Sequence, residues 1–283
     1  MSLISFHNEL LADKIRLRAY SKGIAAVVKP GDRVIDLGTG TGILAFMAAR
    51  AGAQRVYAIE KERIVNLART LAAENGLLDR ISFIRADFSK VSAADIGGKA
   101  DVLISETLGP FGIHEQIVEN YAHAARRLMK PDARYVPARL RLLLVPVTYP
   151  AGRRKFSRLS QVAGFDFRAA QRVLADSEIW VSVKSCAALA RPRAVADFTL
   201  GRPVADTHSG LAARLLSGTE HVFTTTRTGR MDGYMGWFEA ELAPSVVLSS
   251  RRRTHWPNLF LPLTPARRVA RGSTIRVTLW VSK

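Results

Sequence analysis

Two glutamates, Glu106 and Glu115, lie nine positions apart in a segment that contains Gly109 and Gly112 and follows the apolar run 100–104. The apolar run is predicted to be a buried strand, and open α/β sheets bind ligands beyond the carboxyl ends of their strands. Glycine turns can bring the second carboxylate back beside the first. Two carboxylates can accept the rigid fork of N–H donors of a guanidinium. The segment therefore predicts a site for a cationic substrate, and the alternative is a surface loop with two solvated glutamates.

A second segment contains the residues of a cofactor site. The run 32–37 reads as an apolar strand, and Gly38, Gly40 and Gly42 follow at intervals of two before a helical pattern over 43–50. Glycines permit sharp turns and close approach of the backbone to a ligand, and a helix N-terminus offers free N–H groups. Strand, glycine turn and helix in this order predict a nucleotide-type cofactor site in a Rossmann-like sheet.

Further positions favour S-adenosylmethionine over a dinucleotide. The glycines read G-x-G-x-G, whereas the dinucleotide fingerprint is G-x-G-x-x-G. Asp36 ends the first strand, where its carboxylate can orient the amino-acid part of the cofactor directly or through water. Glu60 ends the next predicted strand and can accept both ribose hydroxyls. Asp87 and Phe88 follow a third strand and offer an acceptor for an adenine amino group beside a ring that can pack on the base.

Five blocks of the chain, in order, resemble the protein arginine methyltransferases, and the match extends over most of the length. The blocks are the run 7–16, the glycine turn at 38–42, Glu60, the loop at 105–115 and the Thr-His-Trp triplet at 254–256. The resemblance implies a class I methyltransferase that uses S-adenosylmethionine. It also implies that Glu106 and Glu115 clamp the guanidinium of an arginine in a protein or peptide.

The same resemblance implies roles for residues that spacing alone does not assign. Arg16 is expected to bind the carboxylate of the cofactor, and His7 is expected to help hold it. His255 is expected to pair with Asp13, and Trp256 to line the acceptor tunnel. Glu106, Glu115, His255 and Asp13 thus form the predicted catalytic set, and no metal ligand is assigned.

Three features depart from the family pattern. Six residues precede His7, where the family carries an aromatic-rich helix over the cofactor. Thr107 and Leu108 stand where tryptophan and methionine are common. Ser89 stands at the position of the family's usual glutamate, so the adenine contact is assigned to Asp87.

Composition limits the class of protein and its partners. The 283 residues are 48% hydrophobic, which is enough for two folded domains or one large domain. The single Cys186 excludes an internal disulfide, and neither a secretion signal nor a run of about 20 apolar residues is present, so a cytoplasmic protein without membrane association is expected. The net charge of +18 favours association with nucleic acid, ribosomes or acidic proteins and disfavours an arginine-rich tail as substrate. The alternative is a solvated arginine-rich surface.

The order of elements predicts two domains. Alternating strands and helices predict a doubly wound parallel sheet, a Rossmann-like domain that binds S-adenosylmethionine, over residues 1–145. Short strands and turns predict a β-rich, barrel-like substrate domain over 146–283. Helices are predicted at 63–74, 116–129, 157–163 and 167–175. The family carries a dimerisation arm around 150–190, where no helical hairpin is predicted, and homodimerisation is an expectation from the resemblance.

Three functions remain open on the sequence. The first is methyl transfer to arginine in a protein. The second keeps the methyltransferase and changes the acceptor to an amine of a small metabolite, a ribosomal protein or a nucleic-acid component. The third is a binding protein that keeps the fold without chemistry.

Overall fold

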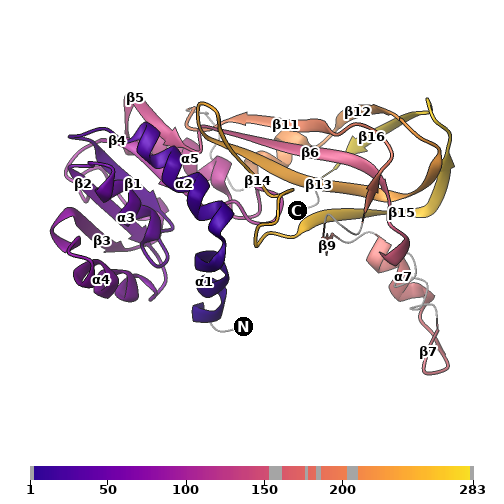
Figure 1. The fold of residues 1–283 in the computed structure, drawn as a ribbon, viewed down its shortest axis with the longest axis horizontal. Helices are drawn as coiled ribbons and strands as arrows, with labels where there is room; N and C mark the ends of the chain where they lie inside the picture. Colours follow the sequence, from indigo (N-terminus) through magenta and orange to yellow (C-terminus); the bar gives the residue numbers. More distant parts are fainter. Residues whose placement is uncertain (1–2, 153–160, 176–177, 183–185, 203–209, 281–283) are drawn as a thin grey trace.

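The chain folds into a parallel sheet flanked by helices, followed by a β-rich part (Figure 1). The computed structural model describes residues 3–152, 161–175, 178–182, 186–202 and 210–280. In Figure 1 the parallel sheet lies on the left and the long antiparallel strands on the right. The predicted fold class is thereby confirmed. Among the described residues, no helix is both long and apolar enough to span a membrane.

The parallel sheet has five strands in the order β3-β2-β1-β4-β5. They are β1 (Arg33–Leu37), β2 (Arg55–Glu60), β3 (Ile81–Arg85), β4 (Ala100–Ser105) and β5 (Met129–Val136). The strand order reverses between β1 and β4, and such a reversal opens a crevice beyond the carboxyl ends of the two strands. Leu37 at the end of β1 is the register partner of Ser105 at the end of β4. The glycine turn and Glu106 therefore emerge side by side.

Helices connect these strands and extend the chain before them. They are α1 (Leu3–Ala12), α2 (Lys14–Val27), α3 (Ile43–Arg50), α4 (Val65–Glu74) and α5 (Ile117–Arg127), with short 3-10 turns η1 (Leu78–Arg80) and η2 (Phe88–Lys90). Asp13 separates α1 from α2 and caps α2, because its side chain accepts a hydrogen bond from the Arg16 amide. This cap places Arg16 in the first turn of α2, where its side chain is buried.

The β-rich part contains a seven-stranded antiparallel sheet and a separate pair of strands. In the sheet the path is β10-β6-β13-β15-β9, while β11 pairs with β6 and β14 with β13. Its strands are β6 (Arg139–Thr148), β9 (Ile179–Val181), β10 (Ala187–Ala188), β11 (Arg193–Thr199), β13 (Gly229–Ala243), β14 (Val246–Ser249) and β15 (Asn258–Val269). The separate pair is β12 (Thr219–Thr224) with β16 (Thr274–Leu279), and α8 (Leu211–Leu216) precedes it.

A short hairpin and a helix project from the β-rich part (Figure 1). The hairpin consists of β7 (Gln161–Val162) and β8 (Phe165–Asp166), and the helix is α7 (Arg168–Ala175). We call residues 161–175 the arm. After the arm the chain returns to the sheet at β9, which pairs with the start of β15.

Helix α2 holds the two sheets together. It contacts α3 and β5 on one side and β13 and β14 on the other. A Cβ atom at Gly23 of α2 would lie 2.6 Å from Leu242 Cβ, so only glycine allows the helix to approach β13 this closely. The approach brings the start of α2 within reach of the loop that follows β14.

Two predicted helices differ from the structure. The helix predicted over 116–129 ends at Arg127, and Met129 instead begins β5 because it pairs with Ala100 of β4. The helix predicted over 157–163 is wrong in its described part, where β7 occupies 161–162. Ala163 and Gly164 both have positive φ, which is typical of a tight hairpin turn and ends any helix. Residues 157–160 lie outside the described part, and the helix predicted at 167–175 is confirmed as α7.

The β-rich prediction omitted two of its longest strands. Pro146 and two prolines in β15 interrupt the alternating pattern of β6 and β15, which made both difficult to recognise. The change of sheet takes place between Val136 of β5 and Arg139 of β6. The predicted domain boundary at residue 145 stays a prediction.

Candidate active site

Two adjoining cavities, of about 470 and 570 Å³, lie beyond the carboxyl ends of the parallel strands. Their shared lining residues are Gly38, Glu60, Lys61, Thr107 and Glu115. We call the first the Arg16 cavity and the second the Asp87 cavity. The Arg16 cavity is also lined by His7, Arg16, Gly40, Glu106, His255 and Trp256, and the Asp87 cavity by Asp87, Phe88, Ser89 and His114. The structure thus brings most of the predicted site residues to one place.

Of the three glycines of the turn, Gly38 lines both cavities, Gly40 lines the Arg16 cavity, and Gly42 lines neither. Gly38, Gly40 and Gly42 have φ values of +70°, +54° and +87°, a region that side chains strongly disfavour. An added Cβ would also lie 2.9 Å from Thr107 Cγ2 at Gly38 and 2.9 Å from the His7 ring at Gly40. The turn therefore needs glycine both for its backbone and for the close approach of neighbouring groups.

Asp36 lies behind the glycine turn rather than on the cavity wall. The side chain is fully buried, its Oδ2 accepts a hydrogen bond from Thr39 Oγ1 at 2.6 Å, and its Oδ1 has no hydrogen-bond partner among the described residues. Burial raises the pKa of Asp36 to about 7. A buried carboxylate with an unsatisfied oxygen is costly, and a nearby cationic group or a water molecule would relieve that cost.

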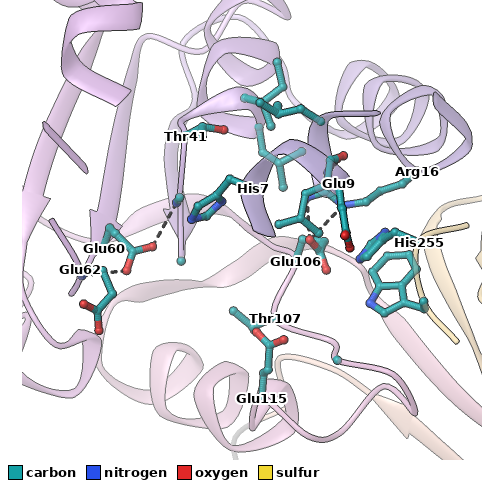
Figure 2. Close-up of a pocket in the computed structure, with 18 of the residues that line it drawn as sticks. His7, Glu9, Arg16, Thr41, Glu60, Glu62, Glu106, Thr107, Glu115 and His255 are labelled. Carbon is teal, nitrogen blue, oxygen red and sulfur yellow. Dashed lines mark hydrogen bonds and ion pairs between the residues drawn. The ribbon is translucent and has the colours of Figure 1, made fainter. Parts of the chain in front are cut away.

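Glu60 accepts two backbone hydrogen bonds at the end of β2. Its Oε2 lies 3.1 Å from the Gly40 amide nitrogen and its Oε1 lies 3.0 Å from that of Glu62, which Figure 2 shows as dashed lines. His7 lies beside this group, and burial lowers the pKa of its imidazole, an effect that the Glu60 carboxylate opposes. Glu60 is therefore held at the junction of the two cavities.

Arg16 and Glu106 contact each other directly. Glu106 Oε2 accepts hydrogen bonds from Arg16 Nε at 2.9 Å and from Arg16 Nη2 at 2.6 Å (Figure 2). Both side chains are almost completely buried. The cation predicted to bind the cofactor carboxylate and a carboxylate predicted to bind the acceptor thus neutralise each other in this structure.

Glu115 reaches the cavities from the opposite side of the loop, beside Thr107 in Figure 2. The residue is accessible from both cavities. Although Glu115 is exposed to the cavities, the protein around it partly desolvates the carboxylate, and this desolvation, followed by the negative charge of Glu106, raises the pKa of Glu115 to about 7. Such a carboxylate gains from a cation placed beside it.

His255 and Asp13 form the predicted pair. Asp13 Oδ2 lies 2.9 Å from His255 Nδ1 and also accepts from the His255 amide at 2.9 Å. Although burial opposes the shift, hydrogen bonds from Arg16 and His255 hold the pKa of Asp13 below its usual value. Trp256 follows, with its ring 3.9 Å from the His255 ring and 5.0 Å from that of Phe238, centroid to centroid.

Asp87, Phe88 and Ser89 of the Asp87 cavity are more exposed. Asp87 Oδ1 accepts from the Ser89 amide at 2.9 Å and from Ser89 Oγ at 2.6 Å, and these hydrogen bonds lower the pKa of Asp87. Phe88 packs edge-on against His123, with the ring centroids 5.7 Å apart. Both residues line the cavity, and their predicted contact with a base stays a prediction.

Sequence reasoning missed three residues of the site. Tyr20 is fully buried and donates a hydrogen bond to the Ser105 carbonyl at 2.9 Å, which fixes the end of β4. Thr107 and Lys61 line both cavities. Tyr20 lies one helical turn after Arg16 and Lys61 directly follows Glu60, so their positions relative to predicted residues could have identified both.

Comparison of the sequence identifies methyltransferases. A family model described as "Ribosomal protein L11 methyltransferase (PrmA)" matches residues 19–136. "Protein arginine N-methyltransferase 6" of Danio rerio is 33% identical over 146 residues, which are 51% of this chain and 41% of that protein. "Arginine N(omega)-methyltransferase" of Streptomyces achromogenes subsp. streptozoticus is 28% identical over 97% of this chain and 75% of its own length. The chain thus spans less than half of the Danio relative and three quarters of the Streptomyces one.

Solved structures share the fold. The chain matches the structure of the "Trypanosoma brucei PRMT1 enzyme-prozyme heterotetrameric complex with AdoHcy" with a TM-score of 0.86 and 23% identity, over 96% of this chain and 87% of that chain. It matches the Arabidopsis thaliana protein arginine methyltransferase 10 structure with a TM-score of 0.77 and 22% identity, over 95% of this chain and 85% of that chain. At these identities the match establishes the arrangement of both sheets.

Proposed function

The chain is a relative of the protein arginine N-methyltransferases, and from this premise we propose that it transfers a methyl group from S-adenosylmethionine to a guanidinium nitrogen of arginine in a protein. The observation that carries the proposal is that Glu106 and Glu115 line one cavity together with the glycine turn. Two carboxylates beside a cofactor cradle suit a cationic acceptor better than a neutral base.

The residues around the cavities fit the proposed cofactor. The glycine turn lets a ligand approach the backbone, Glu60 would accept the hydroxyls of a ribose, and Arg16 would offer a cation for a carboxylate. Asp36 is buried behind the glycine turn, and its negative charge would act on an ammonium group through a water molecule. When bound, S-adenosylmethionine supplies an electrophilic methyl group on a sulfonium. The Trypanosoma neighbour, which is a complex with AdoHcy, supports this choice.

Glu106 and Glu115 would act on the charge of the acceptor. A guanidinium has a pKa above about 12, so neither carboxylate deprotonates it efficiently beforehand. Hydrogen bonds from its non-reacting nitrogens to the two carboxylates draw positive charge away from the third nitrogen and leave electron density there. Holding the acceptor in line is an entropic contribution that can reach roughly 7–11 kcal/mol for well-oriented groups.

The reaction releases one proton. As the new N–C bond forms and the S–C bond breaks, the attacking nitrogen carries a proton that becomes acidic. Glu115 or the imidazole of His255, which is held by Asp13, would accept it. Because Arg16 occupies Glu106 in the present structure, Glu106 must share or exchange this partner before it binds an acceptor.

Free arginine is the second candidate acceptor. The Streptomyces relative is named for arginine rather than for protein arginine, and it aligns with 97% of this chain. Free arginine presents the same guanidinium to Glu106 and Glu115. The two acceptors differ in what lies outside the cavity, where a protein would contact the loop at 251–255 and free arginine would present its α-carboxylate.

Transfer of radiolabelled methyl groups tests the proposal. Purified protein would be incubated with labelled S-adenosylmethionine and with host protein, RNA and small-molecule fractions, with and without free arginine, beside a Glu115→Gln control. Label in methylarginine of protein, lost in the control, is the expected result. Label in free methylarginine only would favour the second candidate. Label in RNA or in another amine, or no transfer despite cofactor binding, would contradict arginine methylation.

We also propose self-association through the arm. Phe165, Phe167 and Val173 of the arm are 69%, 42% and 68% exposed, an unusual set for a segment that projects into solvent. The Trypanosoma neighbour is part of a heterotetramer, which supports an assembly of related chains. Light scattering of the wild type and of a Phe165→Asp variant would reveal loss of a dimer.

A further inference from the structure

His114 immediately precedes Glu115 and is held on three sides. Its Nδ1 accepts from the Phe111 amide at 3.3 Å, within the same loop. Its Nε2 lies 3.1 Å from Glu178 Oε2, and its ring packs edge-on against Trp180 with a centroid separation of 5.3 Å. Glu178 directly precedes β9 and Trp180 lies within it, where the chain returns from the arm. His114 thus joins the two-glutamate loop to the segment that follows the arm.

The tautomer of His114 follows from these partners. Nδ1 receives an N–H from Phe111, so it carries no proton of its own, and Nε2 carries the hydrogen that it donates to Glu178. The hydrogen bond to His114 lowers the pKa of Glu178, which shows that the carboxylate gains from this contact in its ionised form. Each ring nitrogen therefore fixes a different segment.

The backbone around Glu115 depends on such an anchor. Gln116 has a φ of +59°, which is unfavourable for a residue other than glycine, and it directly follows Glu115. Gly109 packs against His114, since an added Cβ would lie 2.8 Å from His114 Cβ. Phe111 is buried in the core, where a Cβ at Gly236 would lie 2.7 Å from its ring. Glu115 thus lies between Gln116, whose backbone is strained, and His114, whose Nε2 forms a hydrogen bond outside the loop.

We propose that His114 is a positioning residue for Glu115, and that it acts through Glu178, so that the segment leading from the arm sets the direction of the Glu115 carboxylate. This inference rests on the proposed function of Glu115 as an acceptor ligand. Trp180 supports the ring from the side, and the Glu178 side chain, which is 52% exposed, makes the contact reversible. Movement of the arm would then change acceptor binding and leave the cofactor side intact.

Two substitutions at His114 separate its two hydrogen bonds. Glutamine places an amide N–H near the position of Nε2 and keeps a donor for Glu178, whereas asparagine offers an acceptor near the position of Nδ1 for Phe111 and does not reach Glu178. Glu178→Ala removes the external partner. The matched control is Glu220→Ala, which removes an exposed glutamate that pairs with Arg276 on β16, in the β-rich part.

Steady-state kinetics and hydrogen exchange test the proposal together. We expect His114→Asn and Glu178→Ala to lower kcat/KM for the acceptor by about tenfold, while His114→Gln stays within about threefold of the wild type. The Kd for S-adenosylhomocysteine should change less than about twofold in all of them, because the cofactor side keeps its contacts. Amide exchange over residues 106–116 should be faster in Glu178→Ala than in Glu220→Ala.

Each outcome decides a separate question. Equal kinetics and equal exchange in Glu178→Ala and Glu220→Ala would overturn the positioning role. Equal loss in the asparagine and glutamine variants would assign the effect to the loop alone and also overturn it. If the wild type transfers no methyl group to any arginine, the proposed function fails, and the exchange comparison still decides whether Glu178 holds the loop.

Discussion

Replacing Asp36 by asparagine keeps the shape of the side chain and removes its charge. The wild-type carboxylate is fully buried behind the glycine turn and has one oxygen without a hydrogen-bond partner among the described residues. Burial raises its pKa from 3.8 to about 7. The ionised form is therefore less favourable in the folded protein than in the unfolded chain, and the folded state loses stability wherever that form is populated.

The size of the effect follows from the two pKa values. Below about pH 3.8 both states hold the proton and the carboxyl group costs nothing, the cost grows as the pH rises, and it is constant above about pH 7. At about 1.36 kcal/mol for each pKa unit, the penalty is roughly 2 kcal/mol at pH 5 and roughly 4 kcal/mol at pH 8. The stability of Asp36→Asn relative to the wild type should therefore increase by about 2–3 kcal/mol from pH 5 to pH 8.

Urea unfolding of both proteins at pH 5 and pH 8, without ligand, measures the difference. Asp101→Asn is the matched control, because the hydrogen bonds and charge of its partners, including Lys130, hold the pKa of Asp101 below its usual value despite the opposing effect of burial. The stability that the ionised Asp101 contributes is lost only as the pH falls through that lowered pKa. The effect of Asp101→Asn on the free energy of unfolding should therefore be the same at pH 5 and pH 8. A stability difference for Asp36→Asn that does not grow with pH would refute the reasoning. Cofactor affinity should fall in the variant, since the buried negative charge that would act on an ammonium group through water is gone.

Four further results are expected. Glu115→Gln should lower kcat for methyl transfer by about a hundredfold or more, because the lost charge acts on the acceptor. The Kd of this variant for S-adenosylhomocysteine should change less than about twofold. The wild-type rate should rise roughly tenfold from pH 6 to pH 8 in a pH profile, since the pKa of Glu115 is about 7 and only its ionised form binds a cation. Arg16→Ala should weaken cofactor binding by about 10- to 100-fold in calorimetry, because a buried charged donor is lost. Glutamine at all three positions of 251–253 should raise KM for an arginine peptide with acidic flanks and lower KM for a lysine-flanked peptide, and equal effects on both peptides would exclude a charge role for this run.

The sequence was sufficient to predict the parallel sheet because its strands and glycine turn follow local rules. An apolar strand that ends at Asp36, three glycines and a helix specify one known arrangement, and the structure has it. The return of Glu115 towards Glu106 could also be predicted, since Gly109 and Gly112 both take positive φ. These features depend on neighbours close in the sequence.

Contacts between distant segments could not be derived from local patterns. The partner of His114 lies 64 positions away in Glu178, and the contact of Arg16 with Glu106 joins residues 90 positions apart. The family resemblance predicted the pairing of Asp13 with His255. It predicted that Arg16 binds a ligand, and it did not predict the ion pair between Arg16 and Glu106. Such pairings are set by how α2 and β9 pack on the sheets, which spacing in the sequence does not encode.

Departures from stabilising local rules are concentrated around the two cavities. Asp36 keeps an unsatisfied buried oxygen, Gln116 adopts a positive φ beside Glu115, and the glycines of the turn leave no room for a Cβ. The buried unsatisfied oxygen and the strained backbone of Gln116 each cost folding free energy, and both lie beside the cavities rather than in the core of either sheet. The charges of Arg16 and Glu106 already neutralise each other without a ligand. Neither of these two buried charges therefore needs a ligand to compensate it. Among the described residues, neither Glu115 nor Asp36 forms an ion pair. Glu115 lines both cavities, and its raised pKa therefore marks a position where positive charge is expected to bind, whereas Asp36 lies behind the glycine turn and would act on a cation through water.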